Sequence, residues 1–66
     1  MKIRYQGREE ATARSLLAEF LSDKGVDTSK AIVECGDEVY APGSDLSSVE
    51  LLDGMDVNVF KVVAGG

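Results

Sequence analysis

The sequence predicts a small α+β fold, a roll with a mixed sheet of four to five strands and one main helix packed on one face. Apolar and polar residues alternate near both ends of the chain, as in strands with one buried face. Between these segments the apolar spacing changes to that of an amphipathic helix. A chain of 66 residues has material for one core, so we expect a single domain over residues 1–66.

The N-terminal segment predicts a hairpin. "MKIRYQG" alternates with a period of two, which indicates a strand with Met1, Ile3 and Tyr5 on its buried face. Gly7 supplies a turn, and "REEATA" after it is expected to form a short return arm.

A helix is predicted over residues 12–24. Thr12 or Ser15 is a suitable N-cap, and Gly25 is a typical helix stop. The apolar side chains expected on one stripe of this helix are Ala13, Leu16, Leu17, Phe20 and Leu21.

Three further segments complete the predicted fold. "AIVEC" at 31–35 is rich in strand-forming residues, and a turn at Gly36 leads into the short strand "EVY". "DLSSVELLDG" at 45–54 has no clear period, and we expect a single helical turn there. "MDVNVFKV" at 55–62 alternates again, and we expect this last strand to lie beside the first.

Charge and composition narrow the classes of partner. The net charge is −5, and residues 16–66 carry three bases against ten acids, so nucleic-acid binding is disfavoured and a basic partner protein is favoured. The sequence has no long apolar run, so we expect no signal peptide or membrane span and a cytoplasmic location. We also expect the chain to be a monomer when it is alone.

The sequence lacks the residues of a stand-alone enzyme. It has no histidine, and Cys35 is its only cysteine, so neither a usual general base nor a metal cluster is available. Its internal glycines do not form a phosphate-binding loop. We therefore expect no catalytic residue, no bound metal and no cofactor on this chain, and we expect Cys35 to be a structural residue.

The segment "FKVVAGG" at 60–66 is the strongest functional signal. A terminal Gly-Gly arises by chance about once in 200 chains, given that glycine makes up about 7% of residues. Here it directly follows a predicted strand, so Val63, Ala64, Gly65 and Gly66 are expected to form a short flexible arm. Such an arm can enter a narrow channel in a partner and present its carboxylate there.

Length, element order and the ending "LLDGMDVNVFKVVAGG" resemble the β-grasp sulfur carriers, the ThiS/MoaD family, which share the ubiquitin-like β-grasp fold. "VAGG" after an "F-x-V" strand is the specific part of this resemblance. The thiamine-biosynthesis branch fits better, because the molybdopterin synthase small subunits (MoaD) tend to be longer and to carry prolines before the diglycine.

The resemblance implies a carrier that partner enzymes act upon. A ThiF-like adenylyltransferase would use ATP to convert the Gly66 carboxylate into an acyl adenylate. A sulfur donor would then form a thiocarboxylate, which delivers sulfur to a ThiG-like thiazole synthase. Two alternatives stay open at this point: a MoaD-like subunit, and a ubiquitin-like modifier conjugated to lysines through Gly66.

A partner-docking face is expected on the last strand. The alternation that buries Val57 and Val59 turns Phe60 and Val62 to the opposite face of the sheet. The outward residues of the first strand, Lys2 and Arg4, are expected on that same face. One predicted helix cannot cover both faces, so the exposed apolar side chains favour a docking role.

Overall fold

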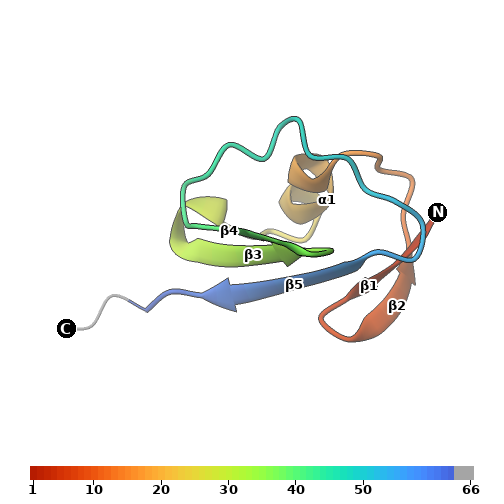
Figure 1. Cartoon of the computed structure of the whole chain (residues 1–66), viewed down its shortest axis with the longest axis horizontal. Coiled ribbons are helices and arrows are strands. Elements are labelled where there is room, and N and C mark those ends of the chain that lie inside the picture. Colours follow the sequence, from red (N-terminus) through yellow and green to blue (C-terminus); the bar gives the residue numbers. More distant parts are fainter. Residues whose placement is uncertain (64–66) are drawn as a thin grey trace.

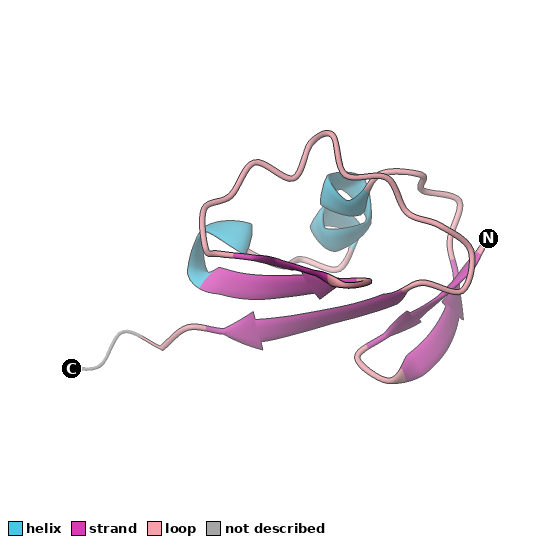
Figure 2. Cartoon of the chain, in the orientation of Figure 1, coloured by secondary structure: helices cyan, strands magenta, loops and turns pink. Residues whose placement is uncertain are grey.

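The computed structural model describes residues 1–63. Its helical elements are short, and a long loop joins the fourth strand to the fifth (Figures 1 and 2). The elements, in chain order, are β1 (Lys2–Tyr5), β2 (Arg8–Ala11), α1 (Leu17–Asp23), the 3₁₀ helix η1 (Thr28–Lys30), β3 (Ala31–Cys35), β4 (Glu38–Tyr40) and β5 (Asp56–Lys61). Within residues 1–63, no helix is both long enough and apolar enough to cross a membrane.

The five strands form one mixed sheet in the order β2-β1-β5-β3-β4. β1 and β5 pair in parallel, with Arg4 opposite Asp56 and Tyr5 opposite Val57, while the other pairings are antiparallel. The α+β class, the mixed sheet and the contact between the first and last strands are therefore confirmed. The predicted return arm is also confirmed, since β2 pairs with β1 after a turn at Gln6 and Gly7.

The core lies between one face of the sheet and a layer made of α1 and the long connection from β4 to β5 (Figure 1). Tyr5 joins the two layers, because its ring packs edge-on against Phe20 with centroids 5.2 Å apart. The buried apolar side chains of the described residues are Ile3, Leu17, Phe20, Leu21, Ala31, Val33, Cys35, Leu46, Leu51 and Val57.

The predicted helix is too long at its N-terminal end. Residues 12–16 are not helical, and Leu16 forms an isolated antiparallel bridge with Glu50. The adjoining backbone bonds run from Leu17 N to Val49 O and from Leu51 N to Ser15 O. Because these pairings hold the chain extended, neither expected cap is used, and the residue before α1 makes no side-chain capping bond. The predicted stop is confirmed, since Gly25 has φ +72°.

The helical turn predicted within 45–54 is also wrong. This segment is a loop whose backbone is shaped by a local side chain: Asp45 Oδ1 accepts hydrogen bonds from Ser47 N at 3.0 Å and from Ser47 Oγ at 2.6 Å. Leu46 and Leu51 anchor the loop in the core. Their burial therefore reflects a tethered loop and not a helical face.

Candidate functional site: the end of the last strand

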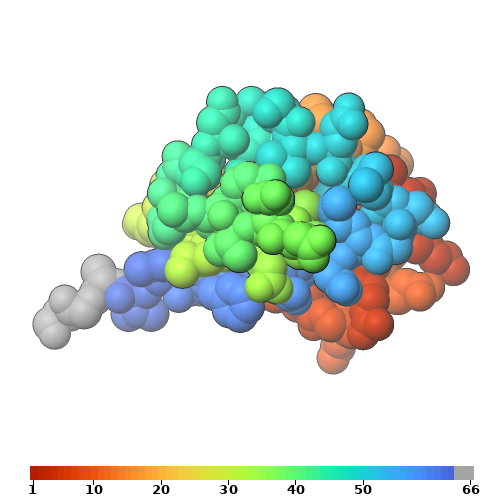
Figure 3. Space-filling model, in the orientation of Figure 1, coloured from red at the N-terminus to blue at the C-terminus, as the bar shows by residue number. Residues whose placement is uncertain are grey.

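β5 carries the chain from the middle of the sheet to one end of the molecule. β5 ends at Lys61, and the space-filling view shows the end of this strand at one end of the body (Figure 3). The last described residue, Val63, is 84% exposed. The remaining residues of the expected arm, Ala64, Gly65 and Gly66, lie outside the described residues.

Hydrogen bonds hold the first half of β5 on both sides. Asp56 O accepts from Gly36 N on the β3 side, and Val57 O accepts from Gln6 N on the β1 side, both at 2.9 Å. The backbone N–H and C=O groups of even-numbered β5 residues thus point toward β3, and those of odd-numbered residues point toward β1. This is the alternation that an antiparallel pair requires.

Gln6 ends the pairing between β1 and β5. Its side-chain amide donates to Val59 O at 2.9 Å and accepts from Val59 N at 3.0 Å. The side chain therefore satisfies the two backbone groups that another residue of β1 would otherwise have bonded. Its backbone has a φ of +53°, as needed for the tight turn that follows.

We call the two bonds between the Gln6 side chain and Val59 the Gln6 clamp. Beyond Val59, the edge of β5 on the β1 side is free. The alternation points the N–H and C=O of Lys61 toward the β1 side, where β1 has already ended. Neither group has a hydrogen-bond partner among residues 1–63. On the other side the strand is still held, because Val62 N donates to Lys30 O at 2.9 Å.

Phe60 and Val62 are exposed on the face of the sheet opposite the helix, as the sequence indicated. Their exposed fractions are 54% and 46%. Phe60 lies opposite Ile32 of β3, and Val39 of β4 adds a further exposed apolar side chain to this face. We call these four residues the apolar face: Ile32, Val39, Phe60 and Val62.

Lys2 and Arg4 lie toward the other end of this face. Arg4 is opposite Asp56, four residues before Phe60, which is about 13 Å along a strand. Both cations also have acidic neighbours: Lys2 Nζ lies 3.4 Å from Glu9, and Arg4 Nε lies 3.5 Å from Asp56. The structure therefore groups Phe60 with Val62 and separates both from the two N-terminal cations.

Cys35 is a core residue at the held end of β5. It is 4% exposed, it lies opposite Val57, and its Sγ is 3.2 Å from Met55 Sδ. Burial raises the pKa of its thiol, which disfavours the nucleophilic thiolate. Among residues 1–63, no group of three or more His, Cys, Asp or Glu side chains could hold a metal ion.

The residues that shape the strand end, Gln6, Lys30 and Lys61, were not singled out from the sequence. A polar residue before a turn glycine and two lysines near strand ends are common features. The parallel pairing of β1 with β5 brings Gln6 to this strand, and the antiparallel pairing of β3 with β5 brings Lys30 to it. In comparisons with protein families and with curated proteins, the sequence matches none of them.

Proposed function

We propose that this protein is a sulfur carrier of the ubiquitin-like β-grasp type, acting in the cytoplasm for thiazole formation in thiamine biosynthesis. The observation that carries the proposal is the order of elements at the end of the sequence. A central strand is followed by two valines and then by Ala64, Gly65 and Gly66. The proposal takes Gly66 as the C-terminal residue of the mature protein.

The chemistry begins with activation, because a free carboxylate is a poor electrophile. A ThiF-like adenylyltransferase joins the Gly66 carboxylate to the α-phosphorus of ATP and releases pyrophosphate. A sulfide-equivalent donor then attacks the acyl carbon, and AMP leaves with the electrons of the broken C–O bond. The product is a thiocarboxylate, whose sulfur attacks the intermediate held by a ThiG-like thiazole synthase.

The contribution of this chain is binding and presentation. The pairing of β5 with β3 continues to Lys61, two residues before the start of the expected arm. The apolar face offers Phe60 and Val62 to a partner, and an aromatic side chain that fills a partner pocket contributes about 2 kcal/mol or more. Catalytic groups come from the partner enzymes, in keeping with a sequence that has no histidine.

Intact-mass spectrometry tests this proposal directly. The protein is incubated with ATP, sodium sulfide and a purified ThiF-type adenylyltransferase. A mass gain equal to the exchange of one oxygen for sulfur, located at Gly66 by fragmentation, is the expected result. A variant lacking Gly66 is the control and gains nothing.

Two other products would contradict the proposal. Isopeptide adducts through Gly66 would identify a protein modifier. A thiocarboxylate that transfers sulfur to a molybdopterin synthase large subunit, and not to a thiazole synthase, would identify a MoaD-like subunit. A mature protein that ends elsewhere than Gly66 would also overturn it.

A further inference from the structure

A groove runs beside the free edge of β5. Its volume is about 530 Å³, and it lies between the second half of β5, the end of β1 and the loop after α1. Apolar side chains from all three segments line it, including Tyr5, Val26 and Val59. The groove is thus formed where β1 stops and the neighbouring strand continues.

The groove also collects positive charge. Three lysines line it, Lys24, Lys30 and Lys61, against the single carboxylate of Asp27. Lys24 is paired with Glu10. The Asp27 carboxylate is engaged locally, because it accepts hydrogen bonds from Ser29 N and Ser29 Oγ.

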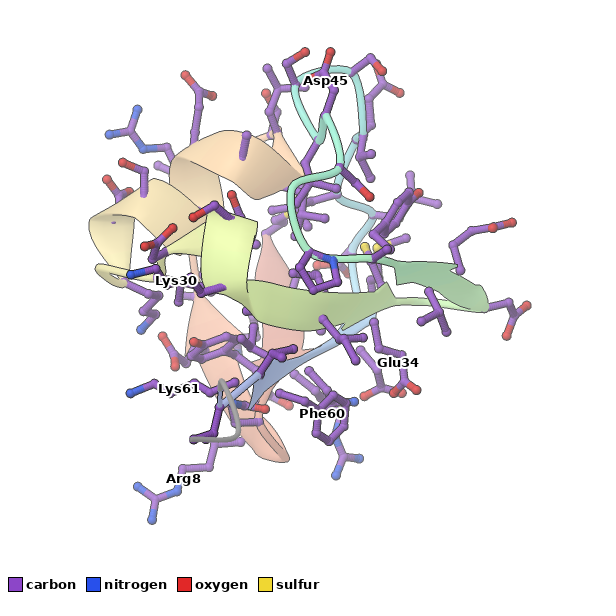
Figure 4. All side chains as sticks on the ribbon, turned by 90° about the vertical axis from the view of Figure 1, so that its left-hand side faces the viewer. Arg8, Lys30, Glu34, Asp45, Phe60 and Lys61 are labelled. Carbon is purple, nitrogen blue, oxygen red and sulfur yellow. The ribbon has the colours of Figure 1, made fainter. Side chains whose placement is uncertain are left out.

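Four of the seven basic side chains form ion pairs within residues 1–63. Ion pairs engage Lys2, Arg4, Arg14 and Lys24. The basic side chains that form no ion pair among residues 1–63 are Arg8, Lys30 and Lys61, although Lys30 lies near enough to Asp27 for their charges to interact. Figure 4 shows these three on one side of the strand end, with Phe60 and Glu34 on the other. A protein with a net charge of −5 therefore presents a localised basic surface beside the groove.

We infer that this groove docks an extended, acidic segment of a partner protein, which pairs with the free edge of β5 at Lys61. The unpaired N–H and C=O of Lys61 supply main-chain hydrogen bonds, as when a peptide adds a strand to a sheet. The apolar lining accepts alternate side chains, and Lys30 and Lys61 attract carboxylates.

The charge of the groove favours an acidic segment over a second copy of this chain. Lysines on a free edge deter pairing with another copy of the same edge, because equal charges repel. An acidic strand is the partner that these lysines attract. The sequence alone favoured a basic partner, and that expectation applies to the acidic remainder of the surface. The inference does not depend on the chemistry at Gly66.

The test uses a peptide probe, acetyl-DEVTVDE-amide, titrated into the ¹⁵N-labelled full chain and followed by NMR. We expect saturable shifts at Lys61 and at residues 25–30, together with slower hydrogen exchange of the Lys61 amide. A charge-reversed probe, acetyl-KKVTVKK-amide, should not bind. A probe with N-methylated valines keeps its charge but loses main-chain donors, and it should bind more weakly.

Two variants with the same change in net charge complete the test. Lys30→Gln with Lys61→Gln should weaken binding of the probe by at least about tenfold. Ser48→Glu with Leu52→Glu alters exposed residues away from the groove and should leave binding unchanged. Dispersed spectra will show that each variant is folded.

Several results would overturn the inference. These are no binding at millimolar probe, equal binding of the charge-reversed or N-methylated probe, and shifts confined to Ile32, Val39 and Phe60 of the apolar face, which do not line the groove. Concentration-dependent shifts at Lys61 without any probe would assign the groove to a second copy of this chain and would likewise overturn it.

Discussion

The two halves of β5 differ in how they are held. Asp56 and Val57 are bonded to strands on both sides, and the Val57 side chain is fully buried. Phe60 and Lys61 are held by β3 alone, and both side chains are exposed. One strand of six residues thus passes from the centre of the core to a surface open to partners. The first half is part of the core, and the second half leaves one backbone edge and two side chains exposed.

The largest effect on stability is expected when one side chain in each half of β5 is replaced by alanine. Val57→Ala removes buried methyl groups and should lower the free energy of unfolding by about 2 kcal/mol. Phe60→Ala removes a larger but exposed side chain and should cost less than about 1 kcal/mol, mainly from its cross-strand contact with Ile32. Urea unfolding followed by circular dichroism measures both. Equal losses would show that the halves do not differ as described.

Cys35 gives a second test of the held half. Cys35→Ala should lower the free energy of unfolding by about 1 kcal/mol, because it removes the buried sulfur opposite Val57. Formation of the Gly66 thiocarboxylate should be unchanged, since burial of the thiol disfavours its thiolate. A folded variant that no longer acquires sulfur would instead make Cys35 a sulfur acceptor.

The boundary between the halves depends on Gln6. Gln6→Ala removes both side-chain bonds to Val59 and should lower the free energy of unfolding by about 0.5 to 1 kcal/mol. Faster hydrogen exchange of the Val59 amide is the local readout. The exchange of Val62, which bonds to Lys30, should change less.

Gln6→Asn distinguishes the effect of the two side-chain bonds to Val59 from the effect of the turn at Gln6 and Gly7. Asparagine tolerates the positive φ of this position and suits a turn before Gly7, but it is one methylene too short to span the same distance. Val59 should again exchange faster. If the asparagine variant protects Val59 as well as the native protein does, the turn and not the amide determines the boundary.

The sequence predicts correctly those features that depend on neighbouring residues, and it misses those that depend on residues far away in the sequence. The period of two places Val57 inward and Phe60 outward, because strand alternation is a property of the local sequence. The helix start could not be found this way, since Leu16 and Ser15 are held extended by residues about 35 positions away. The Asp45-x-Ser47 loop did have a local signal, an Asp two residues before a serine.

The features at the end of β5 could be recognised only from the three-dimensional structure. The clamp joins Gln6 to Val59, and the groove joins the loop after α1 to β5. No periodicity connects segments so far apart in the sequence. Alternation could therefore predict Phe60 and Val62 as exposed, whereas the free edge at Lys61 follows only from knowing where β1 stops.

The smallest effect on stability is expected from protonation of Asp27 at low pH, next to η1 and the outer half of β5. The side-chain and backbone hydrogen bonds from Ser29 hold the pKa of Asp27 below its ordinary value. A carboxyl group with a lower pKa in the folded state stabilises the fold above its unfolded pKa. That contribution is lost as the pH falls through the folded pKa. The Asp27 carboxyl, followed by NMR, should therefore titrate below the usual range for aspartate.

The same carboxylate should affect the strand through Lys30, the last residue of η1, whose carbonyl accepts from Val62 N. Asp27→Ala should speed hydrogen exchange of the Val62 amide, and Asp27→Asn, which keeps an acceptor oxygen, should do so less. Asp45→Ala is the matched control, because Asp45 makes the same pair of bonds to Ser47 in the loop before β5. Equal acceleration by the Asp27 and Asp45 variants would show that Val62 reports general loosening. Acceleration by Asp27→Ala alone would show that η1 holds the outer half of β5 from the β3 side, with its other edge free.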